Sequence, residues 1–210
     1  MENEGLYAKL MEDASAVCAA EDRHVLASIA AMAAIEAAPS QSLAQSLGLD
    51  REDLRSQLRS LFPEDGNCFD GNLAESCDLG AEESAIRELL LRFRTPGDPL
   101  GPLLSVLVAH RAMRPNHLWQ DLGLRNRLEL STLMMRHFAP LARRNAQDMK
   151  WKKFFYRMTC SEAGFSLCAA PVCSECSDFD ACFGDESGAS LLARVRQTKA
   201  QDLSASDDSL

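Results

Sequence analysis

Apolar side chains recur three and four positions apart through most of this chain, a pattern typical of helices that bury one face. The pattern predicts helices over residues 22–38 (DRHVLASIAAMAAIEAA), 84–93 (SAIRELLLRF) and 102–113 (PLLSVLVAHRAM). The first opens on Asp22, a residue type that caps helices, and stops before Pro39. Because no stretch alternates convincingly between apolar and polar positions, the expected fold class is all-α, a compact helical domain.

Two stretches of the chain resemble each other. Residues 46–62 (SLGLDREDLRSQLRSLF) and 121–138 (DLGLRNRLELSTLMMRHF) both contain Leu-Gly-Leu, then apolar residues four apart, and both end in phenylalanine. Each stretch also follows an apolar helix. A duplicated helical hairpin unit accounts for this similarity, and so does the ordinary likeness between short leucine-rich helices.

Residues 42–62 (SLAQSLGLDREDLRSQLRSLF) also fit a helix-turn-helix, with the turn at Gly48. The first turn of its second helix reads DRED, however, which directs three carboxylates to the place where DNA phosphates and base edges would lie. Their repulsion disfavours DNA binding. Two helices packed into a core are the favoured interpretation.

Length and charge narrow the classes of protein further. A chain of 210 residues supports one domain with an extensive core. The net charge of -9 lacks the basic footprint of nucleic-acid binding, so no nucleic-acid partner is expected. The start MENEGLYAKLMEDA has neither the basic nor the apolar region of a secretory signal, and no apolar run approaches the roughly 20 residues that span a bilayer. We therefore expect a soluble cytoplasmic protein without a membrane partner.

The expected organisation is one helical domain over residues 1–184, including a cysteine-rich metal-binding loop at 160–184. Residues 185–210 are acidic and serine-rich near their end (DLSASDDSL), which favours a disordered, flexible acidic tail.

The stretch LCAAPVCSECSDFDACFG carries the chemistry. Its spacing, C-x4-C-x2-C-x5-C, places four thiols in fifteen residues, at Cys168, Cys173, Cys176 and Cys182. In a reducing cytosol such thiols favour metal ligands over disulfides. Zinc sites normally use two cysteine pairs a dozen or more residues apart, whereas compact runs of four are typical of iron-sulfur clusters. An iron-sulfur cluster is favoured over zinc, and redox thiols are the third alternative; the following Asp185 and Glu186 are interpreted as solubilising charges.

Basic residues precede the cysteines in RRNAQDMKWKKFFYRMTC. On one continuous helix, Arg143, Lys150 and Arg157 recur every seven residues and form a stripe, with Lys153 beside it. Such a stripe can attract an oxyanion or an acidic partner, and it is also typical of an ordinary solvated helix face.

The run MKWKKFFYRMTCSEAGFSLCAAPVCSECSDFDACFG, with RPNHLWQDLGLRNRLELSTLMMRHFAPLARRN before it, resembles the NifQ family of nitrogen-fixation proteins. The resemblance implies an iron-sulfur protein that binds molybdenum in a Mo-Fe-S cluster and donates it for assembly of the nitrogenase iron-molybdenum cofactor. The implied cluster ligands are Cys168, Cys173, Cys176 and Cys182. The implied partners are a molybdenum source such as molybdate and the cofactor assembly proteins, namely the scaffold and the iron protein. The implied role is that of a carrier, not an enzyme.

Two alternatives to the carrier stay open on the sequence. One is a zinc- or iron-sulfur-containing regulatory protein of helix-turn-helix type, and the other is a redox enzyme, which lacks a glycine-rich nucleotide loop here. His117 is a weaker ligand candidate that can also cap or pack a helix, and His110 and His137 are weaker still. No role is assigned to four further cysteines: Cys18, Cys68, Cys77 and Cys160.

Overall fold

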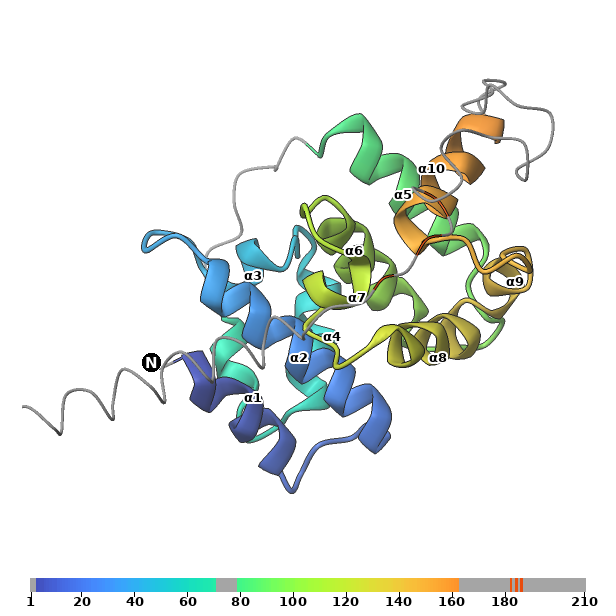
Figure 1. The fold of residues 1–210 in the computed structure, drawn as a ribbon. Coiled ribbons are helices and arrows are strands. Elements are labelled where there is room, and N and C mark those ends of the chain that lie inside the picture. The colour runs from blue at the N-terminus through green and yellow to red at the C-terminus, as the bar shows by residue number, and fades with distance from the viewer. Residues whose placement is uncertain (1–2, 71–78, 163–181, 183, 185, 187–210) are drawn as a thin grey trace, which may run out of the picture.

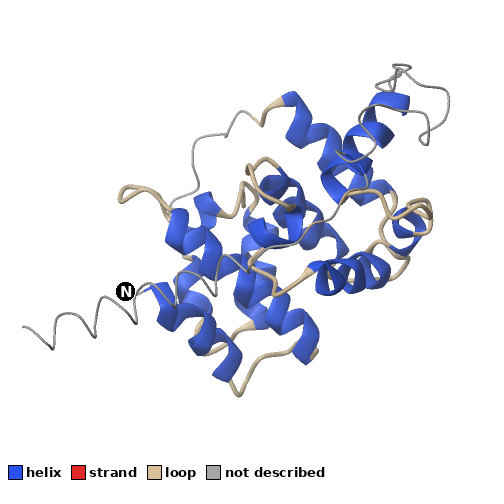
Figure 2. Ribbon diagram, in the orientation of Figure 1, coloured by secondary structure: helices blue, strands red, loops and turns tan. Residues whose placement is uncertain are grey.

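The computed structural model describes residues 3–70, 79–162, 182, 184 and 186 (Figure 1). In this part of the chain there are ten α-helices, one 3-10 helix and no strand, so the expected all-α class is confirmed (Figure 2). None of the described helices is long and apolar enough to cross a membrane. The elements are α1 (Asn3–Glu12), α2 (Ala20–Glu36), α3 (Leu43–Ser46), α4 (Glu52–Leu61), η1 (Gly66–Phe69), α5 (Ala81–Arg92), α6 (Gly101–Ala112), α7 (Leu118–Asp121), α8 (Arg127–His137), α9 (Ala139–Ala142) and α10 (Trp151–Glu162).

The three helices predicted from apolar spacing are present as α2, α5 and α6. The expectation that α2 is capped by Asp22 is wrong, because the helix begins at Ala20 and Asp22 lies in its first turn. Its carboxylate is buried and lies 3.0 Å from His137 Nε2. The Asp22 carboxylate therefore contacts His137 of α8 and does not cap its own helix.

The described chain contains the same order of elements twice. In each half, two longer helices pack on each other, α1 on α2 and α5 on α6, and a hairpin of one short and one long helix follows. The first hairpin is residues 43–61 (α3 and α4) and the second hairpin is residues 118–137 (α7 and α8). In Figure 1 the first half is blue to cyan and the second half is green to yellow.

The two hairpins also agree in local geometry. Their turns contain Gly48 and Gly123, whose φ angles are +69° and +74°. Directly after each glycine, a backbone N–H donates to a carbonyl of the short helix. Leu49 donates to Ala44 at 3.0 Å, and Leu124 donates to Trp119 at 2.9 Å. Glycine is required here because other residues reach this backbone conformation only with strain. The two stretches therefore share the geometry that a duplicated hairpin unit predicts.

The expected continuous basic helix from Arg143 to Arg157 is wrong. Arg143 caps the short α9, and α10 begins only at Trp151. The chain between them turns through Asp148, which has a φ of 54° and so cannot continue a right-handed helix. Of the predicted stripe, Lys153 and Arg157 lie exposed on α10, one helical turn apart.

Candidate metal centre

The cysteine motif is only partly within the described structure. Cys182 is described and is partly buried against the core, whereas Cys168, Cys173 and Cys176 lie outside the described residues. Cys160, the expected start of the metal-binding loop, lies on α10 and is partly buried. Among the described residues, no group of three or more histidine, cysteine or acidic side chains is arranged to hold a metal ion.

Helix α10 fixes the point where the chain enters the cysteine segment. Trp151, Phe154 and Phe155 are 4 %, 4 % and 0 % exposed and anchor the helix in the core. The rings of Trp151 and Phe154 meet edge to face, with centroids 5.8 Å apart. On its outer side α10 packs against α5, where the Tyr156 hydroxyl donates to Glu82 at 3.3 Å (Figure 1). These contacts fix the first half of α10 against the core and against α5.

The chain returns to the other end of the same helix. The backbone N–H of Lys150, directly before α10, donates to the carbonyl of Cys182 at 2.8 Å. Because α10 has twelve residues, its two ends are about 18 Å apart. The segment between Glu162 and Cys182 therefore begins at one end of α10 and finishes at the other, and the last cysteine of the motif is held by a backbone hydrogen bond.

The residue four positions after Cys182 is also held. The Glu186 side chain is 5 % exposed, and its oxygens lie 3.1 Å from His117 Nδ1 and 2.7 Å from an Arg127 terminal nitrogen. The Arg127 contact is an ion pair without the alignment of a hydrogen bond. The interpretation of Glu186 as a solubilising charge is thus wrong, because its side chain is buried against the Arg127 guanidinium and the His117 ring.

A second ion pair joins α10 to the second hairpin. Lys152 Nζ contacts the Asp121 carboxylate, whose side chain is fully buried, and also the carbonyl of Arg114. The same carboxylate accepts from Asn116 Nδ2 at 3.0 Å, and the Asp121 carbonyl accepts from Arg111 Nε at 2.6 Å. Burial lowers the pKa of the Lys152 ammonium, and the hydrogen bond and charge of Asp121 oppose that shift.

Every histidine of the chain lies against a carboxylate. The sequence contains four histidines, of which three, His110, His117 and His137, are candidate metal ligands by sequence. In the structure each ring is engaged with acidic side chains, which gives it a structural role that the sequence did not reveal. The pairs are His24 with Glu129, His110 with Glu83, His117 with Glu186, and His137 with Asp22 and Asp98.

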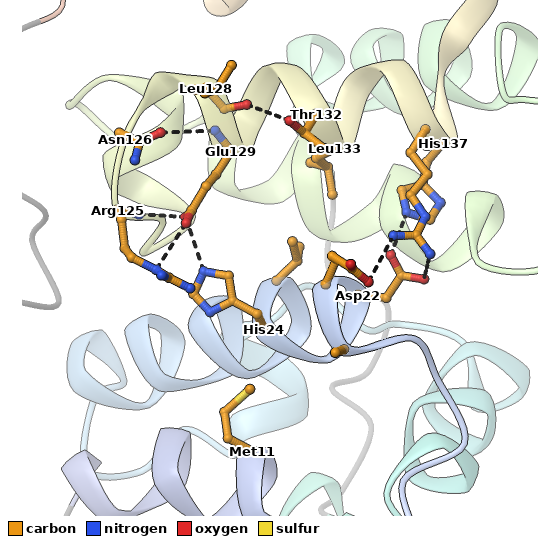
Figure 3. Close-up of a pocket in the computed structure, with 14 residues that line it drawn as sticks. Met11, Asp22, His24, Arg125, Asn126, Leu128, Glu129, Thr132, Leu133 and His137 are labelled. Carbon is orange, nitrogen blue, oxygen red and sulfur yellow. Dashed lines mark hydrogen bonds and ion pairs between the residues drawn. The ribbon is translucent and has the colours of Figure 1, made fainter.

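A pocket of about 540 Å³ lies between α2 and α8 (Figure 3). At one end His24 Nε2 is 3.1 Å from Glu129, which also pairs with Arg125 at 3.0 Å. At the other end His137 contacts Asp22. Sequence reasoning missed this pocket, because its walls come from helices about 100 residues apart and follow no shared motif.

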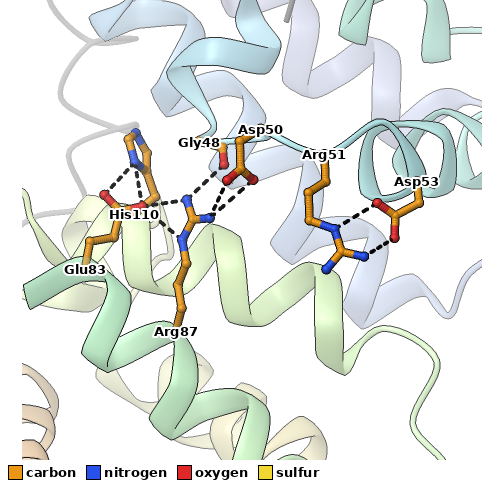
Figure 4. A network of polar contacts seen from close by, with 7 residues as sticks. All are labelled: Gly48, Asp50, Arg51, Asp53, Glu83, Arg87 and His110. Atoms are coloured by element: carbon orange, nitrogen blue, oxygen red, sulfur yellow. Dashed lines mark hydrogen bonds and ion pairs between the residues drawn. The ribbon is translucent and has the colours of Figure 1, made fainter. Parts of the chain in front are cut away.

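The first hairpin is held by a polar network from α5 and α6 (Figure 4). Arg87 donates to Glu83 at 2.6 Å and to the Gly48 carbonyl at 3.0 Å, and it pairs with Asp50 at 3.3 Å. His110 Nδ1 lies 3.3 Å from the same Glu83. The network closes the turn of the hairpin onto the helices of the other half.

The first turn of α4 is acidic, as the sequence predicted. Glu52 and Asp53 occupy it, and Arg51 binds Asp53 through two nitrogens at 3.0 and 2.6 Å (Figure 4). If α4 were the second helix of a helix-turn-helix, these carboxylates would lie at the end of the helix that faces the DNA. That arrangement disfavours approach to phosphate, so the absence of a nucleic-acid partner stays a prediction with a stated physical reason.

The described geometry defines an all-α protein of two similar helical halves, with a cysteine segment fastened to the second hairpin. The chain belongs to the NifQ family, whose model (NifQ) matches residues 25–184.

Several curated relatives support that assignment. The chain is 39% identical to "Protein NifQ homolog" of Sinorhizobium fredii (strain NBRC 101917 / NGR234) over 171 residues, which are 80% of this chain and 74% of the relative. It is 41% identical to "Protein NifQ" of Rhodobacter capsulatus over 69% of this chain and 79% of the relative. It is 36% identical to "Protein NifQ" of Azotobacter vinelandii over 67% of this chain and 78% of the relative. No solved structure matches the chain.

Proposed function

We propose that this protein acts in nitrogen fixation as a carrier of molybdenum for the nitrogenase iron-molybdenum cofactor. The observation that carries the proposal is membership of the NifQ family over residues 25–184, a range that includes all four motif cysteines. The cargo is a molybdenum-iron-sulfur cluster bound through Cys168, Cys173, Cys176 and Cys182. Thiolate and sulfide are soft ligands suited to iron and molybdenum together.

The protein delivers this cargo and does not turn over a substrate. A donor has to release what it holds, and loops are where such exchange is sterically possible. The segment runs from the end of α10 at Glu162 to Cys182, whose carbonyl Lys150 binds. The cluster is accordingly labile towards a strong chelator.

Two exposed cations on α10 support docking of an acidic partner or attraction of molybdate. Lys153 and Arg157 lie on the same face of α10, and Lys150 binds the backbone of Cys182. Partners with this chemistry are the scaffold and the iron protein of cofactor assembly. Replacing Lys150, Lys153 and Arg157 together with glutamine lowers molybdenum loading or transfer; unchanged loading and transfer would remove this part of the proposal.

Metal analysis tests the central proposal. Iron, molybdenum and zinc are measured by plasma mass spectrometry on protein purified without oxygen from cells supplied with molybdate. The expected result is iron with molybdenum in the parent, both lost in a Cys173→Ala, Cys176→Ala double variant and both kept in a Cys18→Ala control, a thiol outside the motif. Zinc alone, at about one per chain, would instead favour a structural zinc site and the regulatory protein.

A further inference from the structure

We propose that Glu186 is a positioning residue for the cluster: clamped between His117 and Arg127, it helps to fix Cys182, which Lys150 holds at the start of α10, as a cluster ligand. The inference rests on the proposed function, because Cys182 has to be a cluster ligand for its position to matter. It adds to that function a group outside the cysteine motif that controls how firmly the motif holds its cargo.

The clamp and the Cys182 anchor meet at one arginine. Arg127 begins α8 and pairs with Glu186 at 2.7 Å through one terminal nitrogen. Through the other it donates to the carbonyl of Asp148 at 2.7 Å and lies 3.3 Å from that of Met149. Met149 directly precedes Lys150, whose N–H holds the Cys182 carbonyl. The Arg127 guanidinium therefore contacts both the chain that leads into Lys150 and the Glu186 side chain, four residues after Cys182.

The spacing makes these two anchors act on the same thiol. Cys182 is held at its own carbonyl and again four residues later at Glu186. Four residues of extended chain span at most about 14 Å, so the two anchors restrict Cys182 from its backbone and from the chain that follows it. A ligand restrained in this way loses less conformational freedom when it binds metal.

Burial shows that the clamp is a built contact. A carboxylate with a 5 % exposed side chain requires compensating partners, and here one is the His117 ring at the start of α7 and the other is Arg127 at the start of α8. The carboxylate itself is shielded from solvent, whereas His117 and Arg127 remain partly exposed. Loss of the Glu186 charge therefore frees the C-terminal side of the motif without touching any cysteine.

The chain contains a matched control. His24, Glu129 and Arg125 form a second histidine–glutamate–arginine group, at the pocket between α2 and α8. It combines the same three residue types, and its printed ion pairs involve neither Cys182 nor Glu186. The Glu129 carboxylate also accepts from the backbone N–H of Arg125 at 2.9 Å, so Glu129→Gln removes a comparable charge and shows what a general loosening at the start of α8 does to the two readouts.

The experiment compares Glu186→Gln with Glu129→Gln and the parent in two readouts. The first is the rate of iron loss from the loaded protein to a chelator, expected to rise about tenfold in Glu186→Gln alone. The second uses metal-free protein: hydrogen exchange over residues 148–151 and alkylation of Cys182 by iodoacetamide, located by mass spectrometry, are both expected to accelerate in Glu186→Gln alone.

The outcomes separate the two proposals. If Glu186→Gln loses iron and exchanges hydrogen at the rates of the parent, the positioning role of Glu186 is overturned, and the proposed carrier function is unaffected. Equal acceleration in both variants would also overturn it, because the effect would then be a general loss of stability. A parent that binds no iron would overturn the carrier and the ligand role of Cys182, while the metal-free exchange still reports whether Glu186 holds the chain.

Discussion

The two hairpins share a backbone and differ in what holds them. The first hairpin is held by Arg87, which α5 directs at the carbonyl of Gly48. The second hairpin is held by Lys152 of α10 and by Glu186, four residues after the last motif cysteine. One copy of the unit is thus tied within the helical body, and the other is tied to the segment that carries the thiols.

Equivalent positions show where the difference arises. The short helices read LAQS in α3 and LWQD in α7, so Ser46 corresponds to Asp121. Ser46 is buried and its hydroxyl donates locally to the Ser42 carbonyl at 3.2 Å, whereas Asp121 is buried with its carboxylate on Lys152. A hydroxyl can be satisfied within its own turn, but a buried carboxylate requires a cation from elsewhere.

The flanking positions follow the same rule. The residue before the short helix is Ser42 in the first hairpin, which accepts from Gln45 N–H, and His117 in the second, which contacts Glu186. The long helices begin with Glu52 in α4 and Arg127 in α8. A few polar differences between two otherwise similar hairpins therefore decide whether these positions are satisfied within the hairpin or by residues distant in the sequence.

The largest expected effect comes from breaking the buried pair of the second hairpin. Asp121→Ala leaves the partly buried Lys152 without its counter-charge and lowers the free energy of unfolding by about 2–4 kcal/mol. The matched change Ser46→Ala removes only a local hydroxyl bond and costs about 0.5–1.5 kcal/mol. Urea denaturation followed by circular dichroism measures both, and equal losses would contradict the distinction between the hairpins.

The turn glycines give the next largest effect. A Cβ at Gly123 would lie 2.6 Å from Met32 Cγ and 2.8 Å from the backbone oxygen of Ser28, whereas at Gly48 it would meet the His110 side chain at 2.7 Å. Both alanine variants carry backbone strain of about 1–2 kcal/mol. Gly123→Ala costs roughly 1–3 kcal/mol more, because a helix backbone yields less than a side chain does. Thermal unfolding of the two variants tests this order, and a more damaging Gly48→Ala would reverse it.

The polar network of Arg87, Glu83 and His110 that holds the first hairpin is sensitive to acid. Burial alone raises the pKa of the Glu83 carboxyl, but hydrogen bonds and charge from His110 and Arg87 outweigh it, so this pKa lies below its ordinary value. A lowered folded-state pKa stabilises the protein above the ordinary carboxyl pKa of about 4 and loses that contribution as the pH falls through the lowered value. Glu83→Gln is expected to cost about 1–3 kcal/mol at pH 7.

The pH dependence distinguishes this charge effect from a packing defect. The difference in unfolding free energy between parent and Glu83→Gln, present at pH 7, narrows as the pH falls below about pH 4. Glu88→Gln is the control, because Glu88 is an exposed acid on the same helix. A Glu83→Gln deficit that persists unchanged in acid would contradict the charge interpretation.

The smallest expected effect concerns the caps of the long helices. In α8 the Asn126 side chain accepts from the Glu129 N–H at 3.1 Å, whereas Arg51 at the start of α4 makes no side-chain cap. Asn126→Ala therefore destabilises by about 1 kcal/mol, and Arg51→Asn stabilises by a similar amount by supplying the missing acceptor. Urea titrations of both variants check the opposite signs, and two changes of the same sign would contradict the comparison.

Sequence reasoning succeeded where the signal is local. Apolar spacing located α2, α5 and α6, and the Leu-Gly-Leu repeat located both hairpin turns. It failed where a residue type has two uses. Asp22 has the chemistry of a cap and also of an ion-pair partner, and the recurrence of Arg143, Lys150 and Arg157 carries no sign of the turn at Asp148. The positive φ of that aspartate is tolerated by a short polar side chain and leaves no mark on periodicity.

The sequence by itself indicated the helical class, the likeness of the two hairpin stretches and the cysteine motif, because each is written in spacings within a few dozen residues, and its resemblance to NifQ proteins indicated the family. Only the tertiary structure decided that Glu186 meets His117 and Arg127, and that the carbonyl of Cys182 meets Lys150. Ion pairs between residues 59 and 69 positions apart follow no period, because their geometry is set by how helices pack. The proposed thiol ligands were readable from the chain, and the surface that holds the last of them was not.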